Sequence, residues 1–321
     1  GGVDMTDMQD EVFKTPVNKI RLFEHGAPGS QNLKLTRKYY TEDMPDGRVK
    51  HIVQNITDPD IVPYIPDGIG NSTDRQRIPA VLIIPGGAFR RLVYNFEGED
   101  VAKWLNSMGI AAFVLECRLP SDEHDNAEDV PLIDAMRAMR VIRGRAQEFG
   151  IDEAKIGVMG FSAGGFMAAL LSTAYESDVY ADYKYKDEYD KLSARPDFAV
   201  CSYPVISIDD CIEAGKRYMS EEQVLERISD GKAKILHKYN PDKLVRPDMP
   251  PVFICETDDD RTTLSENSVG FYMAARKAGV SAELHIFRTG GHGYGCGDDF
   301  AQTGEWKVLF TKWIKSIGII S

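Results

Sequence analysis

Residues 156–171 read IGVMGFSAGGFMAALL, and this stretch decides the fold. Ile156–Met159 is a short apolar run typical of a buried strand, and the small and apolar residues after Ala163 predict a helix. Between them, Gly160–Gly164 has the pattern Gly-x-Ser-x-Gly, in which a sharp strand-to-helix turn exposes a serine hydroxyl at the carboxyl end of a sheet. Alone, this pattern arises by chance in about one chain in ten. A glycine-rich helix start with a capping serine is therefore the alternative to a nucleophile at Ser162.

Apolar runs of the same kind recur along the chain and alternate with segments of helical period. We expect strands at Ala80–Ile84, Ile110–Leu115, Phe198–Cys201, Val252–Cys255 and Ala282–Phe287, the last of them nearer an edge. Shorter, earlier strands are expected at Leu33–Tyr40, His51–Ile56 and Asp60–Ile65. Helices are expected at Gly98–Met108, Ser162–Tyr175, Ser265–Ala278 and Gly304–Ile317, and an apolar stripe from Leu132 to Phe149 predicts another. Continuous apolar strands between helices indicate an α/β fold with a mostly parallel central sheet covered on both faces.

A serine hydroxyl needs a base to accept its proton, and the base needs an acid to orient it. The acidic loop Glu256–Arg261 follows the strand that ends at Cys255 and offers Asp258, Asp259 and Asp260. His292 stands in the sequence GGHGYG at the end of the last strand, where flanking glycines let its ring reach a site built by other strands. The chain order Ser, Asp, His predicts a catalytic triad with His292 as its base, while the choice among the aspartates stays open.

A developing oxyanion also requires preorganised N–H donors. The segment Pro85–Phe89 reads PGGAF and follows the strand Ala80–Ile84, so its small residues expose backbone N–H groups beside the nucleophile. We expect Gly87 or Ala88 to supply one donor and Ala163 the other. A plain glycine turn would be the simpler interpretation of this segment taken alone.

Composition excludes several classes of protein. The chain has 321 residues, 43% of them hydrophobic, with 38 Lys+Arg against 50 Asp+Glu and a formal net charge of −12. Dominant disorder is excluded, and the acidic balance argues against nucleic-acid or basic membrane-surface binding. No apolar run approaches the length of a membrane span. The scattered cysteines (Cys117, Cys201, Cys211, Cys255 and Cys296) indicate buried thiols, not a disulfide framework, and we expect neither a metal nor a cofactor. Oligomeric state and compartment stay open.

The domain organisation is predicted as an N-terminal extension over residues 1–32 and a single domain over residues 33–321. Two stretches interrupt the alternation of strands and helices, near residues 176–195 and 207–250, and are interpreted as insertions at an edge of the sheet or over its top. Arg137, Arg140 and Arg143 lie opposite the apolar stripe that begins at Leu132, which indicates a solvated or ion-paired face.

With these motifs in place, the chain resembles the α/β-hydrolase superfamily, and within it the bacterial esterase/lipase group that includes acetylxylan-esterase-like and feruloyl-esterase-like carbohydrate esterases. The resemblance runs nearly continuously from Ala80 to Ser316, in the motifs PGGAF at 85–89, EGEDVAKWLNSMGIAAFVLECRLP at 97–120, DAMRAMRVIRGRAQEFGID at 134–152, GVMGFSAGG at 157–165, RPDFAVCSYPVIS at 195–207 and GGHGYG at 290–295.

The resemblance implies Ser162 as nucleophile and His292 as base, and the family's Asp-x-x-Val-Pro-x-Glu-Asn-Ser pattern falls on Asp260–Ser268, which makes Asp260 the expected acid. The chain departs from the family at Thr263-Leu264, where Val-Pro is usual, at Phe166, where His is frequent, and at Cys117, where Tyr is frequent. The first departure leaves Asp259 or Asp258 open as the acid, and the other two affect the shape of the pocket.

The activity that the resemblance implies is hydrolysis of carboxylic esters by a serine nucleophile, with removal of short acyl groups, acetyl above all, from carbohydrates or small esters. Two alternatives remain. One is a peptidase of the same fold, which is disfavoured because nothing resembling a propeller domain precedes the hydrolase core. The other is a catalytically silent hydrolase fold that serves as a binding module.

Overall fold

The chain folds around one large, mostly parallel sheet. The computed structural model describes residues 13, 17–69, 76–229, 234–298 and 302–321. The strand order in the sheet is β1-β4-β7-β5-β8-β9-β10-β11, and every pairing from β7 to β11 is parallel, whereas β1 and β4 pair antiparallel. The strands are β1 Ile20–Arg21, β4 Asp60–Tyr64, β5 Ile78–Ile84, β7 Ala111–Glu116, β8 Ile151–Phe161, β9 Ala199–Ser202, β10 Val252–Thr257 and β11 Ala282–Phe287.

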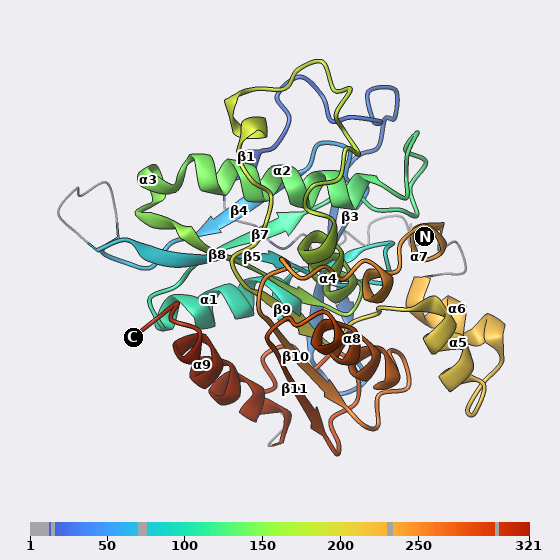
Figure 1. Cartoon of the computed structure of the whole chain (residues 1–321). Coiled ribbons are helices and arrows are strands. Elements are labelled where there is room, and N and C mark those ends of the chain that lie inside the picture. The colour runs from blue at the N-terminus through green and yellow to red at the C-terminus, as the bar shows by residue number, and fades with distance from the viewer. Residues whose placement is uncertain (1–12, 14–16, 70–75, 230–233, 299–301) are drawn as a thin grey trace, which may run out of the picture.

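Helices cover both faces of this sheet, as the sequence predicts (Figure 1). On one face lie α2 Val130–Gly144, α4 Ala163–Ala174 and α8 Glu266–Lys277, and on the other lie α1 Asp100–Ser107 and α9 Trp306–Ser316. The indole rings of Trp104 and Trp306 join the last two helices, with centroids 5.0 Å apart. Strands β7, β9 and β10 are buried along their whole length because neither of their faces meets water.

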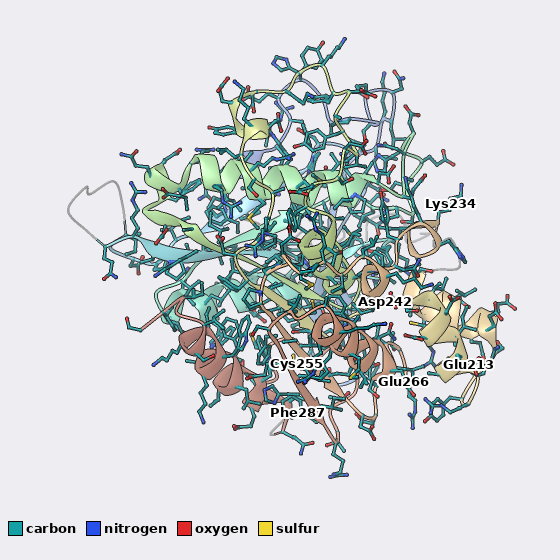
Figure 2. The ribbon with its side chains drawn as sticks, viewed as in Figure 1. Glu213, Lys234, Asp242, Cys255, Glu266 and Phe287 are labelled. Atoms are coloured by element: carbon teal, nitrogen blue, oxygen red, sulfur yellow. The ribbon has the colours of Figure 1, made fainter. Side chains whose placement is uncertain are left out.

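The core fills the space between the sheet and its helices. Figure 2 shows the side chains in place, with Cys255 on β10 and Phe287 at the end of β11. All five cysteines are buried and free, which confirms the prediction of buried thiols. Strand β11 pairs with β10 at the end of the strand order and so forms an edge of the described sheet, as its alternating pattern predicts.

A smaller antiparallel sheet contains β2 Lys38–Asp43, β3 Val49–Gln54 and β6 Leu92–Val93. The prediction of a strand over Leu33–Tyr40 is wrong for its first half, because β2 begins only at Lys38. Arg37 lies outside β2 and turns its guanidinium toward Asp60 and Glu116, with a distance of 2.7 Å to Asp60. The need to pair these buried carboxylates decides the conformation there, not strand propensity.

The apolar stripe that begins at Leu132 belongs to two helical segments instead of one. Helix α2 ends at Gly144, Arg145 caps it, and α3 Ala146–Phe149 follows. On the other side of α2, Arg137 is paired with Asp187 at 2.6 Å and Arg143 with Asp197 at 3.1 Å, so the interpretation of an ion-paired face is confirmed. Residues near 176–195 therefore cover α2.

The second stretch that interrupts the alternation is helical. It contains α5 Ile208–Gly215, α6 Glu221–Ser229 and α7 Lys234–Lys238, although residues 230–233 lie outside the described part. At the other end of the chain, β1 pairs with β4, and Leu22, Phe23 and Ala27 are buried in the core. Residues 1–12 and 14–16 are also outside the described part. The division into an extension and one domain with two insertions stays a prediction.

Candidate active site

Ser162 lies in the turn between β8 and α4 with a φ of +57°, in the left-handed region that a residue other than glycine rarely adopts. The glycines on either side make this turn sterically possible. A Cβ on Gly160 would lie 1.8 Å from the carbonyl oxygen of Gly164, and a Cβ on Gly164 would lie 1.9 Å from that of Ile84. Helix α4, buried from Ala163 to Thr173, can thus start directly against the sheet, with Ser162 at its N-terminus.

Two side chains that are distant in sequence meet Ser162 at the carboxyl ends of the strands. The hydroxyl Oγ of Ser162 lies 2.9 Å from Nε2 of His292, and Nδ1 of His292 lies 2.7 Å from Oδ2 of Asp260. Asp260 follows β10 and His292 follows β11, in the chain order that the sequence predicts. The three side chains form one continuous chain of hydrogen bonds from a hydroxyl to a carboxylate.

The structure distinguishes among the three candidate aspartates by their contacts. Asp260 is fully buried, and its Oδ1 accepts hydrogen bonds from the N–H groups of Thr262, at 2.8 Å, and Thr263, at 2.9 Å. Asp259 is exposed and accepts the N–H of Gly291 at 2.8 Å, so it holds the loop that carries His292. Asp258 is also exposed. Asp260 is thus the aspartate that meets the imidazole.

Thr263 stands where the family has Val, and its hydroxyl is part of the site. Its Oγ1 lies 2.8 Å from the carbonyl oxygen of Tyr203, 3.0 Å from Oδ2 of Asp260 and 3.1 Å from Nδ1 of His292. The ring of Tyr203 also packs edge-on against the imidazole, with centroids 4.9 Å apart. These contacts fix the plane of the histidine ring.

Burial and charge act in opposite directions on the paired groups. Burial would raise the pKa of Asp260, but contact with His292 and the donated hydrogen bonds outweigh it and lower that pKa below its usual range. Burial would lower the pKa of His292, but the Asp260 carboxylate outweighs it and raises that pKa. An imidazole that holds a proton more readily is a stronger base toward the Ser162 hydroxyl.

A second carboxyl group lies behind Asp260. Glu256 is fully buried at the end of β10, and its Oε1 accepts the N–H of Thr257 at 2.9 Å. Burial raises the pKa of Glu256 well above its usual range, and the charge of Asp260 raises it further. The protonated form of Glu256 is therefore favoured, and its carboxyl group offers a hydrogen bond to the Asp260 carboxylate.

The expected oxyanion donors border the serine. Gly87 and Ala88 line the same cavity as Ser162 and His292, and Ala163 begins α4. Ala88 has a φ of +57°, which turns the backbone of this loop sharply after β5. Within the described part of the chain, no acceptor meets the N–H groups of Gly87, Ala88 or Ala163. Three backbone donors thus remain available for a negative oxygen.

Glu97 fixes the other end of this loop. Its Oε1 accepts the N–H of Gly86 at 3.1 Å, and its Oε2 accepts the hydroxyl of Tyr203 at 2.6 Å. Burial raises its pKa, and its neighbours Tyr203 and His292 offset only part of that rise. Glu97 therefore connects the oxyanion loop to the residue that packs against the histidine.

The cavity at Ser162 has a volume of about 210 Å³ and is lined by cationic as well as backbone groups. A second, mainly apolar cavity of about 10 Å³ shares Gly87 with it and is bordered by Ala163, Met167, Leu119 and Cys117. Cys117 therefore lines a pocket beside the active site, in agreement with the expectation that it affects the shape of the pocket. Phe166, the other departure from the family, is fully buried and packs edge-on against Phe89, with centroids 5.5 Å apart.

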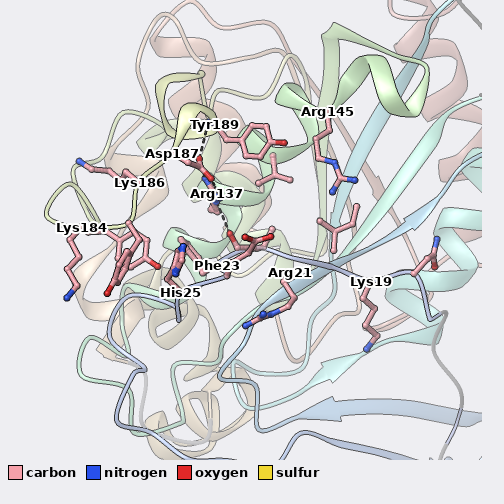
Figure 3. Close-up of a pocket in the computed structure, with 17 residues that line it drawn as sticks. Lys19, Arg21, Phe23, His25, Arg137, Arg145, Lys184, Lys186, Asp187 and Tyr189 are labelled. Atoms are coloured by element: carbon pink, nitrogen blue, oxygen red, sulfur yellow. Dashed lines mark hydrogen bonds and ion pairs between the residues drawn. The ribbon is translucent and has the colours of Figure 1, made fainter. Parts of the chain in front are cut away.

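A larger cleft, of about 930 Å³, lies away from Ser162, between residues 18–25 and the segment 183–189 (Figure 3). Its arginines are paired with carboxylates of the chain, Arg21 with Asp58 among them. Arg137 is paired with Asp187, and Arg145 with Glu148 at 2.6 Å. Neither Ser162 nor any other predicted site residue lines it.

The sequence predicts Ser162, Asp260, His292 and the oxyanion donors as site residues, and the structure brings all of them together. Four further residues of the site, Glu256, Thr263, Tyr203 and Glu97, were missed. Glu256 opens the predicted acidic loop, so its position at a strand end was an available signal. The other histidines, at 25, 51, 124, 237 and 285, form no contact with Ser162 within the described residues.

Two kinds of feature are absent from the described residues. No group of three or more His, Cys, Asp or Glu side chains among them is arranged to hold a metal ion. None of their helices combines the length and the apolar character needed to cross a membrane.

Comparison with known proteins identifies relatives that share this architecture. The sequence model of the BD-FAE family matches residues 69–274. An acetyl ester-xyloside bifunctional hydrolase from Caldicellulosiruptor lactoaceticus has 35% sequence identity and a TM-score of 0.70, with coverage of 94% of this chain and 97% of that one. The carboxylesterase Cest-2923 from Lactobacillus plantarum, at 20% identity and a TM-score of 0.66, covers 89% of this chain and 99% of its own, and supports the α/β-hydrolase fold alone.

Curated relatives are longer proteins. An acetylxylan esterase from Xylanibacter ruminicola is 31% identical over 240 residues, which are 74% of this chain and 45% of that protein. The endo-1,4-beta-xylanase B of Butyrivibrio fibrisolvens is 31% identical over 227 residues, which are 70% of this chain and 34% of that protein. The chain thus spans less than half the length of the curated relatives that it matches.

Proposed function

This chain belongs to the BD-FAE family of α/β-hydrolases, and from that premise we propose that it is a serine esterase that removes acetyl groups from carbohydrates and small esters. The single observation that carries the proposal is the unbroken chain of hydrogen bonds from Ser162 through His292 to Asp260. Relatives described as an acetylxylan esterase and an acetyl ester-xyloside hydrolase support the acetyl and carbohydrate parts.

In the proposed mechanism, Oγ of Ser162 attacks the ester carbonyl carbon while Nε2 of His292 takes the hydroxyl proton. Asp260 holds the imidazole by Nδ1 and stabilises the imidazolium that forms. The carbonyl oxygen becomes negative and accepts hydrogen bonds from N–H groups of Gly87 or Ala88 and of Ala163. The tetrahedral intermediate collapses, the alcohol leaves with the proton from His292, and an acyl-serine remains. Water, deprotonated by His292, repeats the sequence, so that the carboxylic acid departs and Ser162 is restored.

Preference for a short acyl group follows from the space beside the oxyanion donors. The apolar cavity that Gly87 and Ala163 border has a volume of about 10 Å³, room for about one water-sized group. A methyl group is of that size, whereas longer chains would have to displace Met167 or Leu119. We expect kcat/KM to fall steeply from acetyl to butyryl 4-nitrophenyl esters, and Met167→Ala to reduce that fall by enlarging the cavity. Equal rates on acetyl and butyryl esters would contradict the acetyl preference.

The decisive experiment replaces the nucleophile. Ser162→Ala is expected to lower kcat on 4-nitrophenyl acetate by about 10⁴-fold or more, with an unchanged thermal midpoint. The matched control is Ser281→Ala, since Ser281 is exposed and remote from the cavity. A fluorophosphonate probe should label the parent protein at Ser162 and leave the Ser162→Ala variant unlabelled. Activity of the variant equal to that of the parent would remove the proposal.

The same reagents separate the alternatives. A catalytically silent binding protein would not react with the fluorophosphonate. A peptidase would cleave anilides of amino acids faster than matched acetyl esters. For the carbohydrate part, release of acetate from acetylated xylan should be compared with release from 4-nitrophenyl acetate and from feruloyl esters, each expressed as kcat/KM.

A further inference from the structure

The cavity at Ser162 is cationic although the protein as a whole is acidic. Lys50, Arg90, Arg91 and Arg227 line it, in a chain whose formal net charge is −12. These side chains come from different parts of the fold: Lys50 from β3, the two adjacent arginines from the loop after β5, and Arg227 from α6. Their convergence is a property of the tertiary structure.

Among the described residues, most of these cations have no carboxylate within ion-pair distance. Arg91 is paired with Glu42 at 2.5 Å. Within the residues that the structure describes, Lys50, Arg90 and Arg227 form no ion pair, and the hydrogen bond from Arg227 reaches only the carbonyl oxygen of Arg261, at 3.5 Å. The arginines of the larger cleft in Figure 3 differ in this respect, because carboxylates of the chain neutralise them.

Acidic groups nearby offset only part of this charge. Glu42 is paired with Arg91 and also lies opposite Lys50 across β2 and β3. The Asp260 carboxylate is engaged by His292. Glu97 lines the cavity, but it is buried, it holds Tyr203 and Gly86, and burial raises its pKa. Because four cations line the cavity and the carboxyl groups of Glu42 and Glu97 lie beside them, net positive charge faces a ligand there.

We propose that this cavity selects esters whose alcohol half carries a carboxylate, such as an acetylated uronic acid, which Lys50, Arg90 and Arg227 attract. The inference rests on the proposed esterase function and names its substrate class. The carboxylate belongs to the alcohol half because the mainly apolar cavity of about 10 Å³ beside the oxyanion donors has no room for a charged acyl group. The alcohol half occupies the cavity of about 210 Å³ that the cations line.

The size of the preference for the charged ester can be estimated from the strength of ion pairs that are exposed to water. A single exposed ion pair contributes roughly a two- to fivefold preference, and three cations acting together roughly a ten- to hundredfold one. Salt screens such interactions, so the preference should shrink as ionic strength rises from about 0.01 M to 1 M.

The experiment measures kcat/KM for 3-acetoxybenzoate and for its methyl ester, each divided by its rate of hydrolysis by hydroxide. Acetylated methyl glucuronoside and methyl glucoside form a second pair. The carboxylate is expected to be favoured by at least about tenfold at low salt. A third pair, 4-nitrophenyl hydrogen succinate and 4-nitrophenyl pentanoate, places the charge in the acyl half and should show no such preference.

The variants Lys50→Met, Arg90→Gln and Arg227→Gln should each lower the ratio of charged to neutral ester, and the triple variant should bring it close to one. Arg276→Gln, an exposed arginine on α8 outside the cavity, is the matched control and should leave the ratio unchanged. Inhibition of the parent protein by 3-hydroxybenzoate and by 3-hydroxybenzamide, measured over a salt series, tests the same charge without any substitution.

The outcomes separate the two proposals. Turnover of neutral acetyl esters without a carboxylate preference, or a preference that the triple variant retains, overturns this inference and leaves the esterase function standing. A preference for the charged acyl group overturns it as well. Absence of turnover on every ester removes the esterase function itself.

Discussion

At the level of single residues, the His292–Asp260 contact sets the pH range in which the proposed esterase can work. His292 accepts the Ser162 proton only as neutral imidazole. The Asp260 carboxylate favours the imidazolium and raises the pKa of His292 above its usual value, which is about 6.5. As pH falls through that raised pKa, His292 becomes protonated and kcat/KM on 4-nitrophenyl acetate is expected to fall in proportion. The midpoint of this acid limb should therefore lie above about 6.5.

A neutral substrate removes ionisation of the ester from this measurement, and thermal midpoints across the same pH range serve as the control for unfolding. An acid limb centred at or below about pH 6 would contradict the raised pKa. It would mean that burial of the imidazole outweighs the Asp260 charge in solution.

Substitution of Glu256 tests whether this side chain acts through a hydrogen bond to Asp260 or only by filling space. Glu256→Gln keeps a donor toward Asp260 and should change kcat/KM by less than about fivefold, whereas Glu256→Leu removes the donor and should cost about 10- to 100-fold. Asp260 then holds its full negative charge, so the acid limb assigned to His292 should move to higher pH in the leucine variant only. Equal losses in both variants, with no shift of the limb, would indicate that Glu256 only fills space.

Chain order and turn chemistry made Ser162 and His292 predictable from the sequence, because both stand in short glycine-rich turns that follow predicted strands. The residues of the acidic loop alone did not separate Asp260 from Asp258 and Asp259, and only the resemblance to the family favoured Asp260. The difference is that Asp260 turns inward to the N–H groups of Thr262 and Thr263. Which aspartate does so depends on the loop conformation, and no local signal encodes that.

At the level of elements, the junction of β8, α4 and β5 depends on the absence of side chains. In Gly164→Ala, the new Cβ would lie 1.9 Å from the carbonyl oxygen of Ile84 and 2.8 Å from that of Pro85. Helix α4 would have to move away from the sheet, at a cost of about 2–4 kcal/mol. We expect the thermal midpoint to fall by roughly 3–6 °C, and esterase activity to fall as Ser162 is displaced.

Gly270→Ala in helix α8 is the matched control. The neighbour that its Cβ would meet, Oδ2 of Asp210, lies 3.2 Å away at the end of a side chain that can move. Because alanine favours helices over glycine, this variant should be neutral or slightly more stable. A midpoint for Gly164→Ala within about 1 °C of this control would contradict the close packing.

The strands and helices around the sheet were predictable because their apolar runs are continuous and their lengths suit one layer. The ends of these strands and helices were less predictable. The sequence pattern joined α2 and α3 into one helix, since the apolar spacing continues through Arg145, whereas the backbone breaks there. Strand β8 extends back to Ile151, past the polar residues before Ile156, since its first residue pairs with Ile78 on β5.

At the level of the whole molecule, the substrate cavity could not be predicted from the sequence. Lys50, Arg90 and Arg227 are separated by long stretches of chain, and none stands in a recognisable motif. They converge because the smaller sheet, the loop after β5 and helix α6 all border the cavity at Ser162. Only tertiary structure brings together charges that the sequence scatters.

A long-range contact of the whole molecule also anchors the N-terminal segment, through the buried side chain of Arg118. Arg118 and Asp134 are both fully buried, and the guanidinium forms bonds of 2.7 Å to Asp134 and 2.9 Å to Oγ of Ser30. Asp134→Asn removes the countercharge and leaves a buried cation, which should cost about 3–5 kcal/mol of unfolding free energy in urea. Glu153→Gln breaks the exposed pair with Arg77, 2.8 Å long, and should cost no more than about 1 kcal/mol. If residues 20–31 are bound through Arg118, limited proteolysis there should accelerate in Asp134→Asn alone; equal losses in both variants would exclude that anchor.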